Sequence, residues 1–353
     1  MDDLRSQIDA LDEEMAALLA RRARLAQRIG ELKGQQGSAT FAPARESEIL
    51  RRIRDLPTAP LPPEAVASIF TEIVSACRAL EQPLVAAYLG PAYTFTHMAA
   101  LRRFGSHTRL VPTANVYEAF AAVSKHETDI ALVPVENSIR GVEAPTLDAL
   151  AETDLRVCGE FYLPIHYCLA ANCDLDEVTT VFSHPLALAQ CGAWLRRNLP
   201  RAELVETYST AHGAARAAGT PGAAGLCPHL AAEAHGLAIL AENLADLPHN
   251  RTRFLIIGRD SCPPTGRDKT SIVMATKHEA GALYRALAPF DDNGINMTLI
   301  ESRPTRQTPW QYHFFIDFQG HEADDSVSRA LASLRERCLF VKVLGSYPEA
   351  DLH

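Results

Sequence analysis

Residues 18–34 read LLARRARLAQRIGELKG, and one position in this stretch departs from its own pattern. Apolar residues recur in alternating steps of four and three on both sides of position 22, which predicts one long helix over residues 3–33. The series predicts an apolar residue at position 22, where the sequence has Arg22. A buried guanidinium needs an anion, so this residue indicates both how the helix packs and what it binds. The apolar series consists of Leu4, Ile8, Leu11, Met15, Leu18, Leu25, Ile29 and Leu32.

A helix of this length measures about 45 Å, too long to bury its apolar stripe against two shorter helices of the same chain. A dimer that packs two copies together would bury both the stripe and Arg22. Lys33 lies within about 20° of the same helical face, so the two cations flank one pocket for a small polyanion. Arg5 lies on a different face and is expected to reach the partner's pocket. The alternative is a solvated basic face with ordinary ion pairs between residues four apart.

The overall composition is ordinary for a soluble globular protein, with 353 residues, 47% apolar and 22% charged. The length allows two or three domains, and no apolar run reaches the roughly 18 residues that cross a bilayer. The net charge of −9 argues against nucleic acid as a partner. Eight cysteines without a CxxC pair and 13 histidines without an HExxH predict buried, reduced thiols in a cytoplasmic protein and argue against a structural zinc site. The acidic start, MDDLRSQID, is not a signal peptide.

Three segments follow one another along the chain. Residues 1–82 are predicted to be all helical, with Gly34, Gly37 and Pro43 ending the first helix, a second helix starting near Arg45 and a third following PLPP. Short β-type runs such as LVAAYLG, IALVPV and FLIIG then alternate with helical stretches over residues 84–260, which predicts an α/β domain with a largely parallel sheet. After the linker SCPPTGRD, residues 269–349 are predicted to follow the βαββαβ order of ferredoxin-like α+β domains.

The first segment resembles the all-helical, intertwined-dimer chorismate mutases in the stretches LRSQIDALDEEMAALLARRARLAQRIGELK, RESEILRRI and IFTEIVSACRALE. Their reaction, chorismate to prephenate, is a pericyclic rearrangement that needs only a fixed substrate conformer and stabilisation of charge on the ether oxygen. The implied roles are carboxylate binding by Arg5 of the other protomer, Arg22 and Lys33, ether-oxygen contact by Lys33, pocket support by Arg45 and ring-hydroxyl binding by Glu46.

Glu81 stands where the best-known relatives have glutamine, opposite the ether oxygen of the substrate. A carboxylate there would repel that oxygen, so Glu81 is expected to act as a protonated donor. Mutase activity is therefore expected to increase toward acid pH.

The middle segment places hydroxyl and amide side chains near strand ends, in GPAYTFTHMAA, PVENSIRG, FSHPLALAQC, YSTAHGAA and NRTRFLIIG. Ligands of open α/β sheets bind outside the carboxyl ends of strands, and these residues before helices offer anion-binding donors. For Ser183, Ser209 and Thr210 the alternative is a role as helix caps alone. Together the motifs resemble prephenate dehydratase, which implies two lobes like a type 2 periplasmic binding protein with the active site between them. The resemblance makes Thr252 the catalytic hydroxyl, lets Arg253 hold a carboxylate or the cleft, and adds Thr94, Thr96, Asn137, Ser138 and Phe254 as substrate-binding residues.

Four positions depart from the dehydratase pattern, namely Tyr93, Arg140, Leu186 and Arg251. A bulky tyrosine and two additional arginines near the cleft would change its shape. Two alternatives therefore stand beside dehydration: a non-aromatising decarboxylation of prephenate, and a weakened dehydratase.

The last segment resembles the ACT regulatory domain in GALYRALAPFDDNGINMTLIESRP, WQYHFFIDFQGH and KVLGSYP. The resemblance implies a phenylalanine site at an interface between two ACT domains. Its residues would be Gly281, Ala282, Leu283, Asn296, Glu301, Ser302 and Arg303.

The domain order as a whole resembles the bifunctional chorismate mutase–prephenate dehydratases. It implies phenylalanine biosynthesis by a homodimer or larger oligomer that binds chorismate, prephenate and, as feedback inhibitor, L-phenylalanine. The family resemblances imply no metal or organic cofactor. An alternative of another class is an amino-acid sensor without catalysis. Arg22, Lys33 and Thr252 argue against it, because a sensor does not need these residues together.

Overall fold

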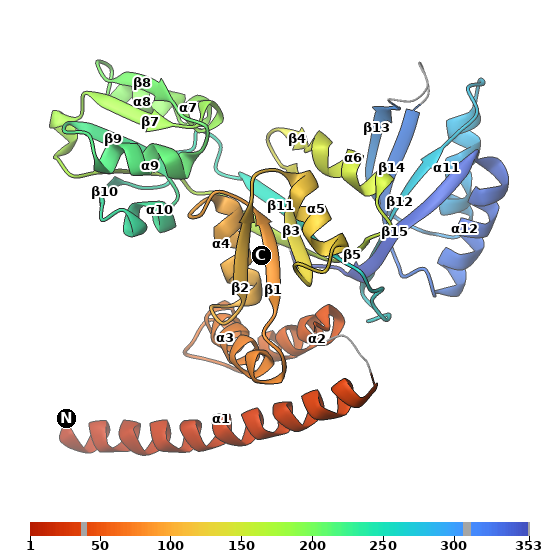
Figure 1. Ribbon diagram of the computed structural model, residues 1–353, viewed down its shortest axis with the longest axis horizontal. Helices are drawn as coiled ribbons and strands as arrows, with labels where there is room; N and C mark the ends of the chain where they lie inside the picture. The colour runs from red at the N-terminus through yellow and green to blue at the C-terminus, as the bar shows by residue number, and fades with distance from the viewer. Residues whose placement is uncertain (37–40, 306–311, 352–353) are drawn as a thin grey trace.

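The computed structural model of the chain describes residues 1–36, 41–305 and 312–351. Figure 1 shows a helical segment below two α/β lobes, and a C-terminal α/β unit on the far side of the first lobe. In the described parts of the chain, no helix is both long and apolar enough to cross a membrane.

The helical segment begins with α1, which is longer than predicted. It does not end at Gly34, and Gly37 lies outside the described residues. Pro43 opens the second helix, because proline lacks only an amide that the first turn of a helix leaves unbonded. The bounds are α1 (Asp2–Gln36), α2 (Pro43–Arg54) and α3 (Pro63–Glu81).

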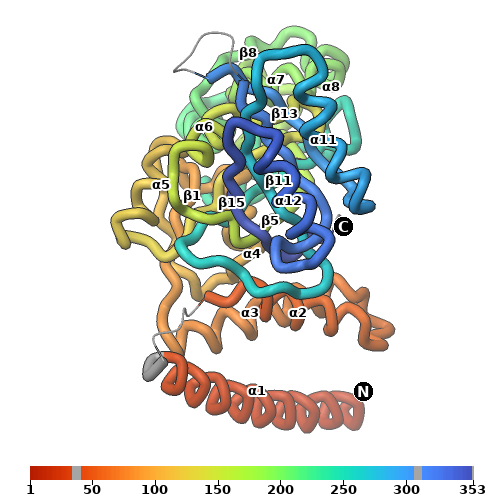
Figure 2. Tube along the Cα trace, turned by 90° about the vertical axis from the view of Figure 1, so that its right-hand side faces the viewer, coloured from red at the N-terminus to blue at the C-terminus, as the bar shows by residue number. Residues whose placement is uncertain are grey.

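Only the C-terminal half of α1 packs on α3. A Cβ at Gly30 would lie 2.9 Å from the Cβ of Glu81, so glycine permits the close approach of the two helices. Residues 1–21 are all exposed, and Figure 1 shows this half of α1 extending beyond α2 and α3. Figure 2 shows α1 lying below α2 and α3, at the edge of the molecule. The eight apolar residues of the predicted stripe are each more than half exposed.

The first lobe is built on a sheet with strand order β2-β1-β3-β11-β5, with β4 paired to β3. The polypeptide chain returns from the second lobe through β11, which runs antiparallel to both of its neighbours, β3 and β5. The elements are β1 (Val85–Leu89), α4 (Phe95–Phe104), β2 (Arg109–Thr113), α5 (Val116–Ser124), β3 (Ile130–Asn137), β4 (Gly141–Val142), α6 (Ala144–Glu152), β5 (Arg156–Pro164) and β11 (Arg251–Gly258).

The second lobe has strand order β10-β6-β9-β7-β8. Only the β1–β2, β1–β3, β7–β8 and β7–β9 pairs are parallel, so the prediction of a largely parallel sheet is wrong: both sheets are mixed. The chain crosses from the first lobe to the second after β5 and returns before β11. Strands β5 and β11 are antiparallel to each other, and β11 is antiparallel to β3. The elements are β6 (Cys168–Ala171), η1 (Leu175–Glu177), β7 (Thr180–Ser183), α7 (Pro185–Gln190), α8 (Gly192–Asn198), β8 (Glu203–Glu206), α9 (Thr210–Ala218), β9 (Ala223–Cys227), α10 (His229–Ala234) and β10 (Ala238–Ala241).

The C-terminal unit has the predicted βαββαβ order and an antiparallel sheet ordered β13-β14-β12-β15. One face of this sheet packs on its own helices, and the other shares a hydrophobic core with the first lobe through Val273, Phe315, Leu344 and Tyr347. The elements are β12 (Asp268–Ala275), α11 (Ala282–Asp292), β13 (Met297–Pro304), β14 (Tyr312–Gln319), α12 (Asp325–Arg337) and β15 (Phe340–Pro348).

Candidate active sites and effector site

A cleft of about 240 Å³ lies between the two lobes, where β1, β3 and β11 of the first lobe face α7 and α9 of the second. Five of the seven residues predicted from the dehydratase motifs line it, from three separate segments of the chain. They are Thr94, Thr96, Asn137, Thr252 and Phe254.

Asn137 and Thr252 face each other across the β3–β11 ladder. The side-chain amide of Asn137 donates to the Thr252 hydroxyl oxygen at 3.0 Å, and its carbonyl oxygen accepts from the amides of Ile139 and Arg140. Because the Thr252 oxygen already accepts a hydrogen bond, its own proton is available to donate. Among the described residues no acceptor takes that proton, so Thr252 is set to donate to a ligand in the cleft.

A chain of buried hydrogen bonds holds Asn137 in this orientation. Its amide also donates to Asn250 at 2.8 Å, Asn250 donates to Gln190 at 3.0 Å, and the hydroxyl of Tyr167 donates to Gln190 at 2.9 Å. This hydrogen-bonded network joins both lobes, and Asn137, Tyr167 and Gln190 all line the cleft. Sequence reasoning missed Tyr167, Gln190 and Asn250, although Gln190 and Asn250 lie within or beside motifs already singled out.

Two helices begin at the cleft, one from each lobe. Thr94 caps α4 by accepting from the amide of His97, and Ser209 caps α9 by accepting from the amide of His212. The capping role that was the alternative for Ser209 is therefore present, whereas the Ser183 hydroxyl donates to the carbonyl of Leu226. The amides that follow each cap have no acceptor within the helix, so both N-termini offer donors to an anion.

Two of the predicted residues lie outside the cleft. Ser138 bonds to the backbone of His249 and Arg251, which fastens the end of β3 to the start of β11. Arg253 does not reach a ligand in the cleft: its side chain is 5% exposed and points to the opposite face of β11, because successive side chains of a strand alternate. It can support the cleft only from behind.

Arg140 supplies the cationic side chain among the cleft residues. Its guanidinium is 44% exposed and lies 3.6 Å from Glu143, so it remains open to a ligand. His184 lies beside it and caps α7 through Nδ1, which leaves Nε2 to carry a proton. Burial, and then the charge of Arg140, lower the pKa of His184, so the imidazole is neutral near pH 7.

Tyr93 takes the backbone conformation that normally selects glycine, with φ of 67°. Its ring contacts His97 of the first lobe and His235 of the second edge-on, each at 5.8 Å. Tyr93 therefore bridges the lobes without lining the cleft, whereas Arg140 and Leu186, two others of the four departing positions, do line it.

The seam between α1 and α3 gathers three of the residues predicted from the mutase motifs. Arg22 donates to the carbonyl of Ile73 at 3.5 Å, and the ammonium of Lys33 lies 3.7 Å from the carboxylate of Glu81. Arg5 lies far from this seam, near the exposed start of α1, where its guanidinium is 3.6 Å from Asp2. One chain therefore supplies Arg22, Lys33 and Glu81 to one surface.

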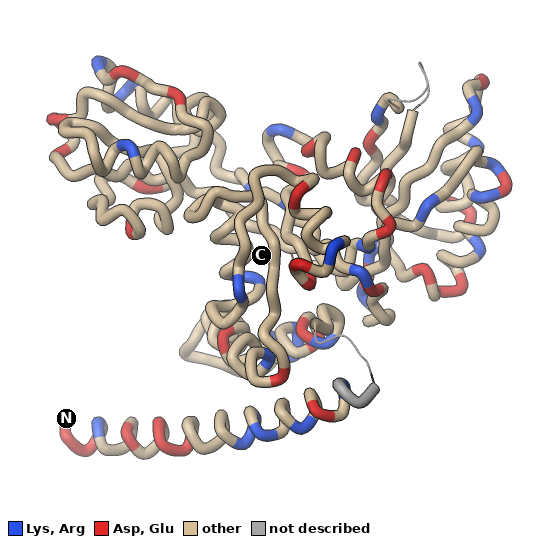
Figure 3. The backbone as a smooth tube through the Cα atoms, viewed as in Figure 1, with Lys and Arg blue, Asp and Glu red and all other residues tan. Residues whose placement is uncertain are grey.

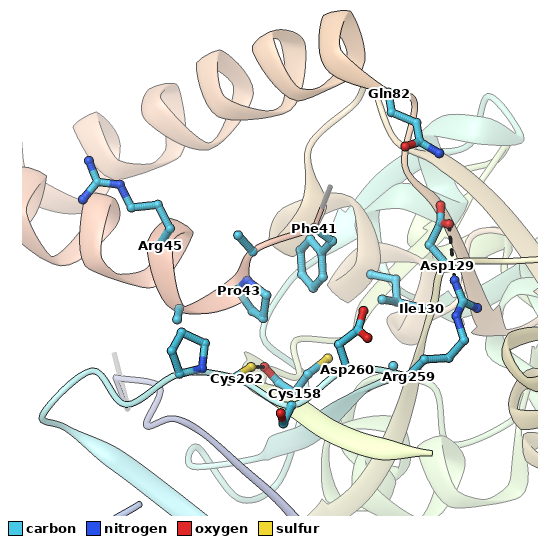
Figure 4. Close-up of a pocket in the computed structure, with 15 residues that line it drawn as sticks. Phe41, Pro43, Arg45, Gln82, Asp129, Ile130, Cys158, Arg259, Asp260 and Cys262 are labelled. Carbon is cyan, nitrogen blue, oxygen red and sulfur yellow. Dashed lines mark hydrogen bonds and ion pairs between the residues drawn. The ribbon is translucent and has the colours of Figure 1, made fainter. Parts of the chain in front are cut away.

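Arg45 and Glu46 point away from this seam. Arg45 pairs with Glu48 at 2.6 Å, and Figure 4 shows its guanidinium directed away from the cavity that residues 41–45 help to line. Glu46 is 7% exposed and its carboxylate bonds to Arg78 of α3 and, at 3.0 Å, to Arg103 of α4. Without a change in these contacts Glu46 does not meet a ligand at the seam.

The residues predicted to bind phenylalanine divide between two faces of the C-terminal sheet. Glu301 and Arg303 lie opposite Phe315 and His313, on the side of the first lobe, where Arg303 forms a two-bonded ion pair with Asp148. Ser302 lies on the other face, with α11. On that side Gly281 has φ of 75° at the start of α11, Ala282 and Leu283 form its first turn, and Asn296 bonds to Gln319 at 3.3 Å.

Comparison with known families gives three matches in the same order as the structural segments. Residues 4–82 match chorismate mutase type II, residues 86–262 match prephenate dehydratase, and residues 270–336 match the ACT domain.

Similar proteins cover the whole chain. The bifunctional chorismate mutase/prephenate dehydratase of Aquifex aeolicus is 43% identical over 100% of this chain and 99% of its own length, and that of Neisseria gonorrhoeae is 44% identical over 99% and 97%. The crystal structure of the Arthrobacter aurescens prephenate dehydratase in complex with L-Phe is 37% identical, has a TM-score of 0.70, and covers 76% of this chain and 92% of that one. Sequence, order of segments and fold agree, and the chain belongs to the bifunctional chorismate mutase/prephenate dehydratase family.

Proposed function

We propose that the chain rearranges chorismate to prephenate at the α1–α3 seam and then converts prephenate to phenylpyruvate in the cleft between the lobes. These are two consecutive steps of phenylalanine biosynthesis, and L-phenylalanine is the feedback effector at the C-terminal unit. The observation that carries the second activity is the Asn137–Thr252 contact, which leaves a hydroxyl proton available in a cleft with a cation.

The chemistry of the second step fits this arrangement. The bond from the ring to its carboxylate breaks and releases CO₂, and the electron pair enters the ring. The ring hydroxyl then leaves as water after receiving a proton, and the ring becomes aromatic. Thr252 serves as the hydrogen-bond acid toward the departing oxygen, while the formation of the aromatic ring supplies the driving force.

Arg140 is the residue that we assign to a carboxylate of prephenate, in place of Arg253. Changing Arg140 to Gln is expected to raise the KM for prephenate by roughly 10-fold or more, because one charge-assisted contact is lost. Initial rates over a range of prephenate concentrations measure this. Arg251→Gln, which alters the other additional arginine, is the matched control; equal KM values in the two variants would remove Arg140 from the site.

Glu81 is assigned to the ether oxygen of chorismate. Because only its protonated form can donate, mutase activity of the parent is expected to increase as the pH falls, and Glu81→Gln is expected to abolish that dependence. Chorismate consumption measured between pH 5 and 8 gives both profiles. Identical profiles for parent and variant would remove Glu81 from the role of donor to the ether oxygen.

A second copy of the chain is the partner that we propose for the exposed half of α1. Eight large apolar side chains on one helix face, each more than half exposed, form an apolar patch of the kind that marks a protein–protein interface. Figure 3 shows mostly acidic residues in the first half of α1 and mostly basic residues in the second, so two antiparallel copies place unlike charges together. That arrangement also carries Arg5 toward the seam of the partner.

One coupled assay tests the proposed function. Purified protein given chorismate is expected to form prephenate and then phenylpyruvate, and added L-phenylalanine is expected to slow the second step. A decarboxylated, non-aromatic product would favour the alternative prephenate chemistry. Binding of phenylalanine without any conversion of chorismate would favour the sensor.

A further inference from the structure

Arg253 links the cleft to the C-terminal unit through a buried group of charges. Its Nε donates to Glu160 of β5 at 2.8 Å, one terminal nitrogen donates to Asp317 of β14 at 2.6 Å, and the other donates to the hydroxyl of Tyr347 at 3.0 Å. The side chains of Glu160 and Asp317 are 0% and 8% exposed. Although burial disfavours the charge, Asp317 and the neighbouring acidic groups raise the pKa of Arg253, so the guanidinium stays ionised.

The partners of Arg253 in the C-terminal unit are themselves fixed. Ser271 of β12 bonds to Asp317 at 2.5 Å and to the Tyr347 hydroxyl at 2.7 Å. The ammonium of Lys269 donates to the other carboxylate oxygen of Glu160 at 3.0 Å. Both buried carboxylates, Glu160 and Asp317, therefore have cationic partners. Three strands of the C-terminal sheet therefore hold one side chain of the first lobe.

The backbone of β11 at Arg253 pairs regularly with β5, opposite Tyr162, but its ladder with β3 is interrupted there. The pairing of β11 with β3 shifts register between Arg253 and Phe254, where β3 contains one additional residue, Val135. Such bulges interrupt the ladder and change the direction of nearby side chains. Arg253 lies between Thr252 and the interruption, and it is the last residue of β11 that pairs in register with the end of β3. The contacts that fix Arg253 therefore bear on the direction of the neighbouring Thr252 side chain.

From these contacts we infer that Asp317 and Tyr347 of the C-terminal unit are positioning residues of the dehydratase reaction. They fix Arg253, Arg253 fixes β11, and β11 directs the Thr252 hydroxyl into the cleft. The C-terminal unit thus completes the cleft as well as carrying an effector site. The inference rests on the proposed function, because it takes Thr252 as the acid.

Asp317→Leu is the first variant of the test. It is expected to lower dehydratase kcat at least 10-fold with less than a threefold change in the KM for prephenate, since the cleft itself is intact. Mutase activity of the same chain is an internal control and is expected to stay within twofold. The matched control is Lys342→Met, which removes another contact of the C-terminal unit, to carbonyls at the end of α6, without touching β11.

A double variant separates positioning from stability. Asp317→Leu leaves Arg253 partly unpaired, whereas Arg253→Met with Asp317→Leu removes both charges and is expected to restore the unfolding temperature. We expect kcat of the double variant to remain at least 10-fold low. Recovery of kcat together with stability, or equal losses in Asp317→Leu and Lys342→Met, would overturn the inference. A parent that forms no phenylpyruvate from prephenate would instead overturn the proposed function, and this inference with it.

Discussion

Changing Thr252 to Val is expected to lower the dehydratase turnover by a factor of roughly 10²–10⁴, because valine keeps the shape of threonine and removes the hydroxyl that donates to the departing oxygen. The side chain lines the cleft, and its oxygen is held by Asn137 at 3.0 Å. Phenylpyruvate formation from prephenate measures the effect. The KM for prephenate is expected to change little, since this contact matters mainly as the bond to oxygen breaks.

Thr252→Ser is the control for this prediction. Serine restores a hydroxyl and is expected to recover a large part of the lost turnover, while mutase activity remains the same in all three proteins. A Thr252→Val enzyme with parental turnover would remove Thr252 from the chemistry. The Asn137–Thr252 contact would then be only a structural bond at the end of β3.

Arg22→Met is expected to cause a comparable loss in the first activity. Chorismate carries two carboxylates, and removing one fixed cation from their site is expected to lower mutase kcat/KM by roughly 10²–10³. Methionine preserves most of the length of the side chain, so packing of α1 on α3 is retained. Chorismate consumption measures the change, and dehydratase activity on added prephenate is expected to be unaffected.

Arg21→Met is the matched control, because Arg21 precedes Arg22 on the same helix and is exposed, whereas Arg22 is partly buried. If both variants lose the same activity, the effect is one of net charge or of helix stability. A loss confined to Arg22→Met supports a specific contact with the substrate.

Much of this architecture was accessible from the sequence, because helical periodicity and strand composition are local properties. The long first helix, the order of the C-terminal unit and five cleft residues were predicted. The direction of β11 was not, since strand direction depends on where the chain returns after crossing between lobes. Short strands such as β9, with the sequence AAGLC, give no strong β signal.

Side-chain direction was the other limit of sequence reasoning. Arg253 follows Thr252 in a motif, yet the alternation of a strand places the two on opposite faces. Glu46 follows Arg45, but its direction depends on Arg103, which is distant in sequence. The roles of Tyr167, Gln190 and Asn250 also depend on contacts between lobes. Motif resemblance identifies which residues matter, but it does not show which way each one faces.

Helix α4 has a practical consequence for anyone who wishes to dissect this enzyme. It starts at Thr94, inside the cleft, and ends about 15 Å away at Phe104, beside the arginine that grips Glu46. A fragment that begins at residue 84 would lack Glu46, the carboxylate partner of Arg103. It would also expose the ring of Phe104, which Phe41 contacts edge-on at 5.9 Å. Dividing the chain between the helical segment and the first lobe would therefore expose the C-terminal end of the helix whose N-terminal end lines the cleft.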